Sequence, residues 1–267
     1  MNIEIKDLRF TYPAGVEALK GIRLSIGSGE QVAIIGQNGA GKTTLVRHFN
    51  GLLKPASGSV FIGGWETTKY SVAKLASRVG YVFQNPDEQL FSRDVLSEVA
   101  FGPRNLGYSK EKTDELVWRA LAWTELSSQI ETNPYDLSPA WRKMIALASI
   151  IAMDTPIVIF DEPTTGQDAV NVARIANVIA GLKKEGKTVV TITHDIDFCA
   201  ENFERVIALS NGQVLLDGPA REVLGEEELL AQTYVDPPQL TRLGKRLGLK
   251  ETVTTQEEFL DVIARAR

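Results

Sequence analysis

A glycine-rich segment contains the residues whose types and spacing best suit phosphate chemistry. Its sequence is Gly36-Gln37-Asn38-Gly39-Ala40-Gly41-Lys42-Thr43, which fits the pattern GxxxxGK[ST]. Backbone N–H groups at such a turn, together with the positive end of a following helix, can bind a phosphate group. Lys42 would reach the β- and γ-phosphates of a nucleotide, and Thr43 would bind Mg²⁺. The alternative is a glycine-rich turn that contains a lysine by chance.

Two acidic residues follow an apolar run further along the chain. Ile157 to Phe160 is predicted to be a buried strand, and Asp161 and Glu162 come directly after it. The carboxyl ends of strands are where α/β sheets bind ligands. Asp161 would hold Mg²⁺ through water, and Glu162 would polarise an attacking water or accept its proton. The alternative is that the two acids merely begin a solvated loop.

The hydrophobic pattern predicts the elements that position these groups. Apolar residues alternate at Ile3 and Ile5 and again from Ile22 to Ile26, as they do in half-buried strands. A helix is predicted over Thr43 to Leu53, directly after the glycine-rich segment. Short apolar runs predict further strands at Gln31 to Ile35, Val79 to Phe83, Ile157 to Phe160, Val189 to Thr193, Val206 to Leu209 and Val214 to Leu216. Because helices separate several of these strands, the fold class is α/β with a mostly parallel sheet.

Two regions depart from this alternation. From about residue 87 to residue 153 the pattern is helical, with Asp94 as a helix cap and an amphipathic run from Lys110 to Leu126. We interpret this region as a helical subdomain inserted between strands. After Gly225 the chain becomes helical again, and its apolar stripes are Leu240, Leu243 and Leu247, then Phe259, Leu260 and Ile263. The predicted organisation is therefore a domain over 1–224 and a C-terminal extension over 225–267.

The composition argues against several classes of protein. Lys+Arg 29 against Asp+Glu 34 gives a net charge of −5, which disfavours a dedicated nucleic-acid binder. A single cysteine, Cys199, rules out an internal disulfide and a Cys-based zinc site, and two histidines, His48 and His194, leave little for a His-based metal site. No run approaches the ~18 apolar residues of a membrane-spanning helix, and the N-terminus lacks a secretory signal. The sequence predicts a soluble, cytoplasmic chain that would serve a membrane only through a partner.

The order of the motifs resembles that of the ATP-binding cassette (ABC) ATPases, over about Met1 to Leu224. The motifs that carry the resemblance are the glycine-rich segment, Gln84, Ser138, Asp161-Glu162, Asp168 and His194. The resemblance implies a P-loop NTPase fold with a mixed sheet, an N-terminal antiparallel β subdomain, an inserted helical subdomain and a small helical C-terminal extension. It also implies ATP and Mg²⁺ as ligands, and ATP hydrolysis as the reaction.

Three segments resemble one branch of that family, the energy-coupling factor importers of vitamins and of transition-metal ions. They are Val82 to Phe91, Val99 to Pro103 and Pro237 to Leu243. The resemblance implies an ATPase subunit at the cytoplasmic face of the membrane, with an integral membrane scaffold and a substrate-binding membrane subunit as partners. It implies no nucleic acid. It also implies that the C-terminal extension helps to join two ATPase subunits.

The resemblance also implies roles for single residues. Tyr12 would stack on adenine, Gln84 would contact Mg²⁺ and the attacking water, and His194 would bind the γ-phosphate beside the catalytic Glu162. The first three residues have plain alternatives: Tyr12 as an inward-packed aromatic, Gln84 as an ordinary loop glutamine and His194 as a structural histidine. His48 and Cys199 are interpreted as structural. The implied ATP-binding set is Tyr12, Gly36, Gln37, Asn38, Gly39, Ala40, Gly41, Lys42, Thr43 and Thr44, and the implied metal ligands are Thr43, Gln84 and Asp161.

One motif departs from the family. ABC ATPases form head-to-tail dimers, and each ATP lies between one chain's phosphate loop and the other chain's signature, usually Leu-Ser-Gly-Gly-Gln. Here the signature reads Leu137-Ser138-Pro139-Ala140-Trp141. Pro139 suits the first position of a helix capped by Ser138, but it removes one backbone donor, and a charge-assisted hydrogen bond is worth about 1.5–3 kcal/mol. Trp141 adds bulk to the interface; the alternative is that it packs back on its own helix and leaves the interface unharmed.

This departure predicts an asymmetric pair, because the chain's own phosphate loop is intact while the signature it offers is impaired. A heterodimer with a second ATPase is favoured over a homodimer, and Ser138, Ala140 and Asp168 are the expected contacts with that partner. Two other functions stay open: a non-hydrolysing, ATP-binding regulatory subunit and a soluble non-transport ABC ATPase. Glu162 argues against the first. A single cassette without sustained heptads argues against the second.

Overall fold

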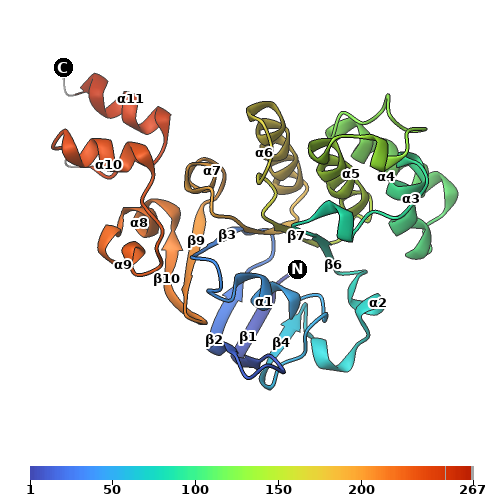
Figure 1. Ribbon diagram of the computed structural model, residues 1–267, viewed down its shortest axis with the longest axis horizontal. Coiled ribbons are helices and arrows are strands. Elements are labelled where there is room, and N and C mark those ends of the chain that lie inside the picture. The colour runs from blue at the N-terminus through green and yellow to red at the C-terminus, as the bar shows by residue number, and fades with distance from the viewer. Residues whose placement is uncertain (250, 266–267) are drawn as a thin grey trace.

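The chain forms two sheets that enclose an apolar core between them, as the computed structural model of residues 1–249 and 251–265 shows (Figure 1). The first sheet is antiparallel, and its strand order is β2-β1-β4-β5. Its strands are β1 (Ile3–Thr11), β2 (Glu17–Ile26), β4 (Ser57–Ile62) and β5 (Trp65–Glu66). Alternate apolar residues of these strands are buried, because one face of the sheet packs inward and the other meets solvent.

The second sheet is mostly parallel, and its strand order is β10-β9-β3-β8-β7-β6. Only β10 runs antiparallel to its neighbour in this sheet. Its strands are β3 (Gln31–Ile35), β6 (Val79–Val82), β7 (Ile157–Asp161), β8 (Thr188–Ile192), β9 (Arg205–Ser210) and β10 (Gln213–Pro219). Of the four interior strands, β3, β7 and β8 are buried along their whole length, as expected for parallel strands covered on both faces.

Helices cover the sheets and form both predicted helical regions. Helix α1 (Lys42–Arg47) packs between the two sheets, where Leu45 and Val46 join the core. The other helices are α2 (Val72–Leu75), α3 (Val95–Asn105), α4 (Lys110–Trp123), α5 (Pro139–Ile151), α6 (Ala169–Lys184), α7 (Ile196–Asn202), α8 (Ala220–Gly225), α9 (Glu227–Ala231), α10 (Gln239–Arg246) and α11 (Gln256–Arg265). Short 3₁₀ turns lie at Thr67–Lys69, Pro86–Glu88 and Pro134–Asp136. Figure 1 shows α3, α4 and α5 grouped at one end of the molecule and α10 and α11 at the other.

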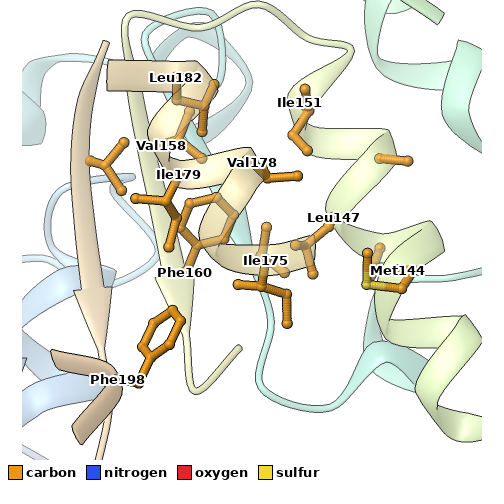
Figure 2. Packing of buried hydrophobic residues seen from close by; sticks show 14 of the residues in the cluster. Met144, Leu147, Ile151, Val158, Phe160, Ile175, Val178, Ile179, Leu182 and Phe198 are labelled. Atoms are coloured by element: carbon orange, nitrogen blue, oxygen red, sulfur yellow. The ribbon is translucent and has the colours of Figure 1, made fainter. Parts of the chain in front are cut away.

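The core on the far side of the parallel sheet joins the inserted helices to the sheet. Figure 2 shows Phe160 of β7 beside side chains of α6, with side chains of α5 next along the same cluster. The labelled α6 residues are Ile175, Val178, Ile179 and Leu182, and the labelled α5 residues are Met144, Leu147 and Ile151. Phe160 is fully buried, so β7, which ends at Asp161 directly before Glu162, is fixed from this side.

The fold confirms the predicted α/β class with its antiparallel, inserted-helical and C-terminal helical parts. The cap at Asp94 is confirmed, because its side chain accepts a hydrogen bond from the Ser97 N–H at 2.7 Å. His48 and Cys199 are buried, as structural residues should be. Within the described ranges, no helix has both the length and the apolar character needed to cross a bilayer. The domain boundary near residue 224 stays a prediction.

One predicted element is wrong in its extent. The helix expected over Thr43 to Leu53 ends at Arg47, and a series of turns follows. Gly51 adopts a φ of 75°, and the Leu53 N–H bonds the Arg47 carbonyl at 2.9 Å across this turn. The N–H groups of His48 and Phe49 bond carbonyls three residues back, so the helix tightens and ends, and the apolar residues beyond Arg47 are buried by turns instead.

Candidate functional site

The glycine-rich segment forms the loop between β3 and α1, and its glycines are required by the backbone. Gly41 caps α1 with a φ of 102°, a left-handed conformation that L side chains rarely adopt. A Cβ atom at Gly36 would lie 2.2 Å from the carbonyl oxygen of Leu209, so only glycine fits there. The loop therefore curls tightly over the N-terminus of α1, as the phosphate-binding interpretation requires.

Lys42 and Thr43 begin α1 and face into this loop. The Lys42 side chain is buried, and its Nζ donates to the carbonyl oxygens of Gly36 at 2.6 Å and Gln37 at 3.1 Å. Burial lowers the pKa of Lys42, although the carboxylates of Glu162 and Asp161 oppose that effect. A buried ammonium of this kind favours a nearby anion.

Asp161 lies at the end of β7 and is bound from two sides. Its Oδ1 lies 3.4 Å from the Thr43 hydroxyl, and its Oδ2 accepts a hydrogen bond from the Tyr81 hydroxyl at 2.6 Å. Burial, and then the charge of Asp161, raise the pKa of Tyr81, so this hydroxyl stays a donor. The amino-acid sequence alone did not predict this contact of Tyr81. It comes from β6, where it pairs with Ile159, two residues before Asp161 on the neighbouring strand.

Glu162 and His194 come together from the ends of β7 and β8. Glu162 is 6% exposed, and its Oε2 lies 2.7 Å from His194 Nδ1 and 3.3 Å from the His194 backbone N–H. An ionised carboxylate can only accept, so Nδ1 carries the hydrogen of this bond and Nε2 is left available. The His194 side chain is 63% exposed, which leaves its outer edge accessible to a ligand.

Two adjoining hollows share Asn38, Gln84 and Glu162. The first, of about 560 Å³, is lined by Tyr12, Lys20, most of the glycine-rich segment and the following Thr44. The second, of about 660 Å³, lies between His194 on one side and the segment before α10, with Tyr234, and Arg242 of α10 on the other. The structure thus brings Gln84, Glu162 and the glycine-rich segment to one place.

Tyr12 borders the first hollow and is half-buried. Its hydroxyl lies 3.0 Å from Thr44 Oγ1, and its ring meets Phe10 edge to face at 4.9 Å. Tyr12 is therefore not packed fully into the core, and its ring lies at the rim of a site of nucleotide size.

The signature residues and Asp168 lie outside both hollows. Ser138 caps α5, and Pro139 is the first helical residue, as expected from their types. Trp141 is half-buried against the chain's own core, with the Arg174 guanidinium of α6 5.3 Å from its ring centroid. This geometry favours the alternative in which Trp141 packs back on its own chain. Asp168 is exposed and caps α6 through the Asn171 N–H at 2.8 Å.

Lys143 is a second residue whose place at the site was not predicted from the amino-acid sequence. It lies on α5 and is 2% exposed, and its Nζ donates to the carbonyl oxygen of Gln84 and, at 3.3 Å, to that of Glu162. Burial lowers the pKa of Lys143 to about 8, and Asp161 and Glu162 oppose part of this shift. In the sequence, a lysine directly before the apolar run of α5 could have indicated a buried cation at this position.

The donor set fits a nucleoside triphosphate with Mg²⁺. Thr43 and Asp161 bring oxygen atoms of the hard type that Mg²⁺ prefers to one place beside the loop. Lys42 and the glycine-rich loop supply a buried cation and backbone donors for phosphate oxygens. Glu162 supplies a carboxylate next to the Mg²⁺-type oxygen atoms and next to the glycine-rich loop.

Comparisons with known proteins agree with this geometry. The family model described as ABC transporter matches residues 19–165. An energy-coupling factor transporter ATP-binding protein, EcfA, from Methanothermobacter thermautotrophicus is 41% identical over 92% of this chain and 80% of its own length. The structure of cbiO1 from Clostridium perfringens, part of the ABC transporter complex cbiONQ, has a TM-score of 0.77 and 35% identity, and the match covers 92% of this chain and 98% of that one.

A dimeric ATP-binding cassette in a post-hydrolysis state, bound to ADP and Pi, is also similar. Its TM-score is 0.75 with 30% identity, and the match covers 82% of this chain and 99% of that one. Some relatives are much longer. This chain spans only 41% and 46% of two putative ABC transporter ATP-binding proteins, from Methanosarcina acetivorans and Caldanaerobacter subterraneus.

Proposed function

Because this chain belongs to the ABC transporter family, we propose that it binds and hydrolyses ATP with Mg²⁺ as the ATPase subunit of an energy-coupling factor importer for vitamins or transition-metal ions. The observation that carries the proposal is the Glu162 carboxylate, buried beside the glycine-rich loop and bonded to His194 at 2.7 Å. The similarity to EcfA and cbiO1 supports the choice of branch.

The chain's own residues supply binding, orientation and proton transfer. Lys42 and the N–H groups of the glycine-rich loop bind and orient the phosphates. Thr43, Gln84 and Asp161 would hold Mg²⁺, which when bound neutralises charge on the phosphate oxygens. Glu162 accepts the proton of the attacking water, and His194 fixes that carboxylate through its Nδ1–H. A γ-phosphate oxygen only accepts hydrogen bonds, so Nε2 donates to it when the imidazole carries a hydrogen on both nitrogens.

We place this chain in a head-to-tail dimer with a second ATPase. In that pair the second chain's signature completes this chain's site, and Ser138, Ala140 and Asp168 face the second chain. Pro139 is the observation that favours two different subunits, because it leaves the N-terminus of α5 without one backbone donor. Since Trp141 packs on its own chain, the missing donor is the main defect. The same feature keeps a non-hydrolysing regulatory subunit as the second candidate.

Two exposed apolar surfaces suit the proposed partners. Phe91 and Phe101 are 61% and 48% exposed and pack edge to face at 4.7 Å, beside the loop that follows Gln84. We assign this pair to the membrane scaffold, which with a substrate-binding membrane subunit would hold the chain at the cytoplasmic face. On the C-terminal extension, Leu243, Leu247 and Leu260 are 42%, 57% and 57% exposed. We assign this second surface to the contact with the second ATPase.

Replacing Tyr12 by leucine is expected to weaken ATP binding about tenfold, because stacking on a base is worth about 1–3 kcal/mol. Tyr12→Phe is the matched control: it keeps the ring and loses only the contact with Thr44. Titration of each full-length variant with a fluorescent ATP analogue and Mg²⁺ gives both affinities. A wild-type chain that does not bind the analogue would overturn the proposed function. Equal affinities for wild type and Tyr12→Leu would remove Tyr12 from the site.

A further inference from the structure

Lys143 joins three segments that the proposed reaction needs but that lie far apart in the sequence. It belongs to α5, the helix that begins with the signature, and its ammonium group bonds the main chain at Gln84 and at Glu162. Both partners are carbonyl oxygens, so Lys143 fixes the backbone and leaves the side chains of Gln84 and Glu162 available. Burying an ammonium group is costly, and its hydrogen bonds offset that cost only while both carbonyls stay in place.

Glu162 has a backbone that needs such support. Its φ is 50°, in the left-handed region that residues other than glycine adopt at a cost of about 1–3 kcal/mol. Its N–H bonds the Ile192 carbonyl at 2.9 Å, and its own carbonyl accepts from Lys143 at 3.3 Å. The strained peptide is thus held by β8 on one side and by α5 on the other.

The loop that contains Gln84 is tied to the same helix. The Gln89 side chain accepts from the Phe83 N–H at 3.1 Å and donates to the Ala146 carbonyl of α5 at 2.7 Å. Lys143 adds a bond at Gln84 itself and extends the connection to Glu162. A movement of α5 therefore acts on both backbones through one side chain.

We propose that Lys143 is a positioning residue, which couples the signature helix to the backbones of Gln84 and Glu162 and so sets the catalytic carboxylate for water activation. This inference rests on the proposed function. It implies that removing the ammonium group displaces Glu162 while the phosphate loop still binds ATP. The consequence is a loss in kcat with little change in KM, which a general loss of stability would not produce.

The first test is hydrogen–deuterium exchange of the full-length chain without nucleotide. Lys143→Met is expected to speed exchange about tenfold in the peptides that cover residues 82–86 and 161–165. Lys187→Met is the matched control, because Lys187 Nζ also bonds a main-chain carbonyl, that of Asp154 at 2.9 Å, at the opposite end of β8. Unchanged exchange in either peptide, or the same change in both variants, would overturn the proposal. This arm needs no ATPase activity, so its outcome is independent of the proposed function.

The second test is steady-state hydrolysis in a copy of the chain with a complete Leu-Ser-Gly-Gly-Gln signature. Lys143→Met is expected to lower kcat about tenfold and to leave KM for ATP within about twofold. Lys143→Gln keeps an N–H donor and so tolerates burial better. Its kcat is expected to lie between that of the parent copy and that of Lys143→Met. A higher KM at unchanged kcat in both variants would contradict a positioning role.

Discussion

Replacing Glu162 by glutamine is expected to reduce ATP turnover by about 100-fold or more, because a positioned general base contributes about 10²- to 10⁴-fold. Glutamine keeps the size of the side chain and its acceptor oxygen toward His194, so ATP should stay bound. Single-turnover hydrolysis and binding of a fluorescent ATP analogue, measured side by side in copies with a complete signature, separate the two effects.

The control for this variant is Glu185→Gln. Glu185 follows α6 on the surface and pairs with Arg119 at 2.9 Å. The Glu185→Gln variant therefore loses a carboxylate of the same kind, but away from the site. Its turnover should equal that of the parent chain. If Glu162→Gln turned over ATP at the parent rate as well, Glu162 would not be the base, and the role assigned to the acidic pair would be wrong.

Restoring the signature is the second change with a large expected effect. The triple substitution Pro139→Gly, Ala140→Gly and Trp141→Gln should raise turnover by the chain alone about ten- to one-hundredfold. That range corresponds to one recovered charge-assisted hydrogen bond in the transition state. Steady-state ATP hydrolysis at a fixed chain concentration, with Mg²⁺, measures the gain.

Trp141→Gln alone separates the two possible causes of the impaired signature, the missing N–H of Pro139 and the bulk of Trp141. Because Trp141 packs against its own chain and Arg174, its removal should lower thermal stability without restoring the donor that Pro139 lacks. Its turnover should stay at the wild-type level. A full gain from Trp141→Gln alone would mean that the bulk of the indole, and not the missing N–H, impairs the signature.

The sequence predicts those parts of the site that depend on local spacing. The glycine-rich loop, the acidic pair and the caps at Asp94 and Ser138 are all formed by residues within a few positions of each other. The types of these residues therefore indicate which backbone conformations they adopt, as glycine at position 41 indicates a positive φ. The strands were equally predictable, since buried parallel strands are continuous apolar runs.

Contacts between distant segments could not be predicted in the same way. Tyr81 reaches Asp161 only because β6 and β7 are neighbours in register, and Lys143 reaches Gln84 and Glu162 only because α5 packs over both. The side on which Trp141 packs depends on Arg174, which lies on another helix. The early end of α1 was missed because apolar residues are buried equally well by the turns after Arg47.

The most direct test of the account is whether this chain needs a signature from elsewhere. The donor for that test is a copy that carries the restored signature together with Glu162→Gln, so that it lends a complete signature and cannot itself turn over ATP. Steady-state hydrolysis is measured for the wild-type chain over a range of concentrations, alone and with increasing amounts of the donor. The account predicts background turnover by either chain alone and turnover that rises and saturates in the mixture. Turnover by the wild-type chain alone that rises more than linearly with its concentration, and that the donor does not increase, would contradict the asymmetric pair.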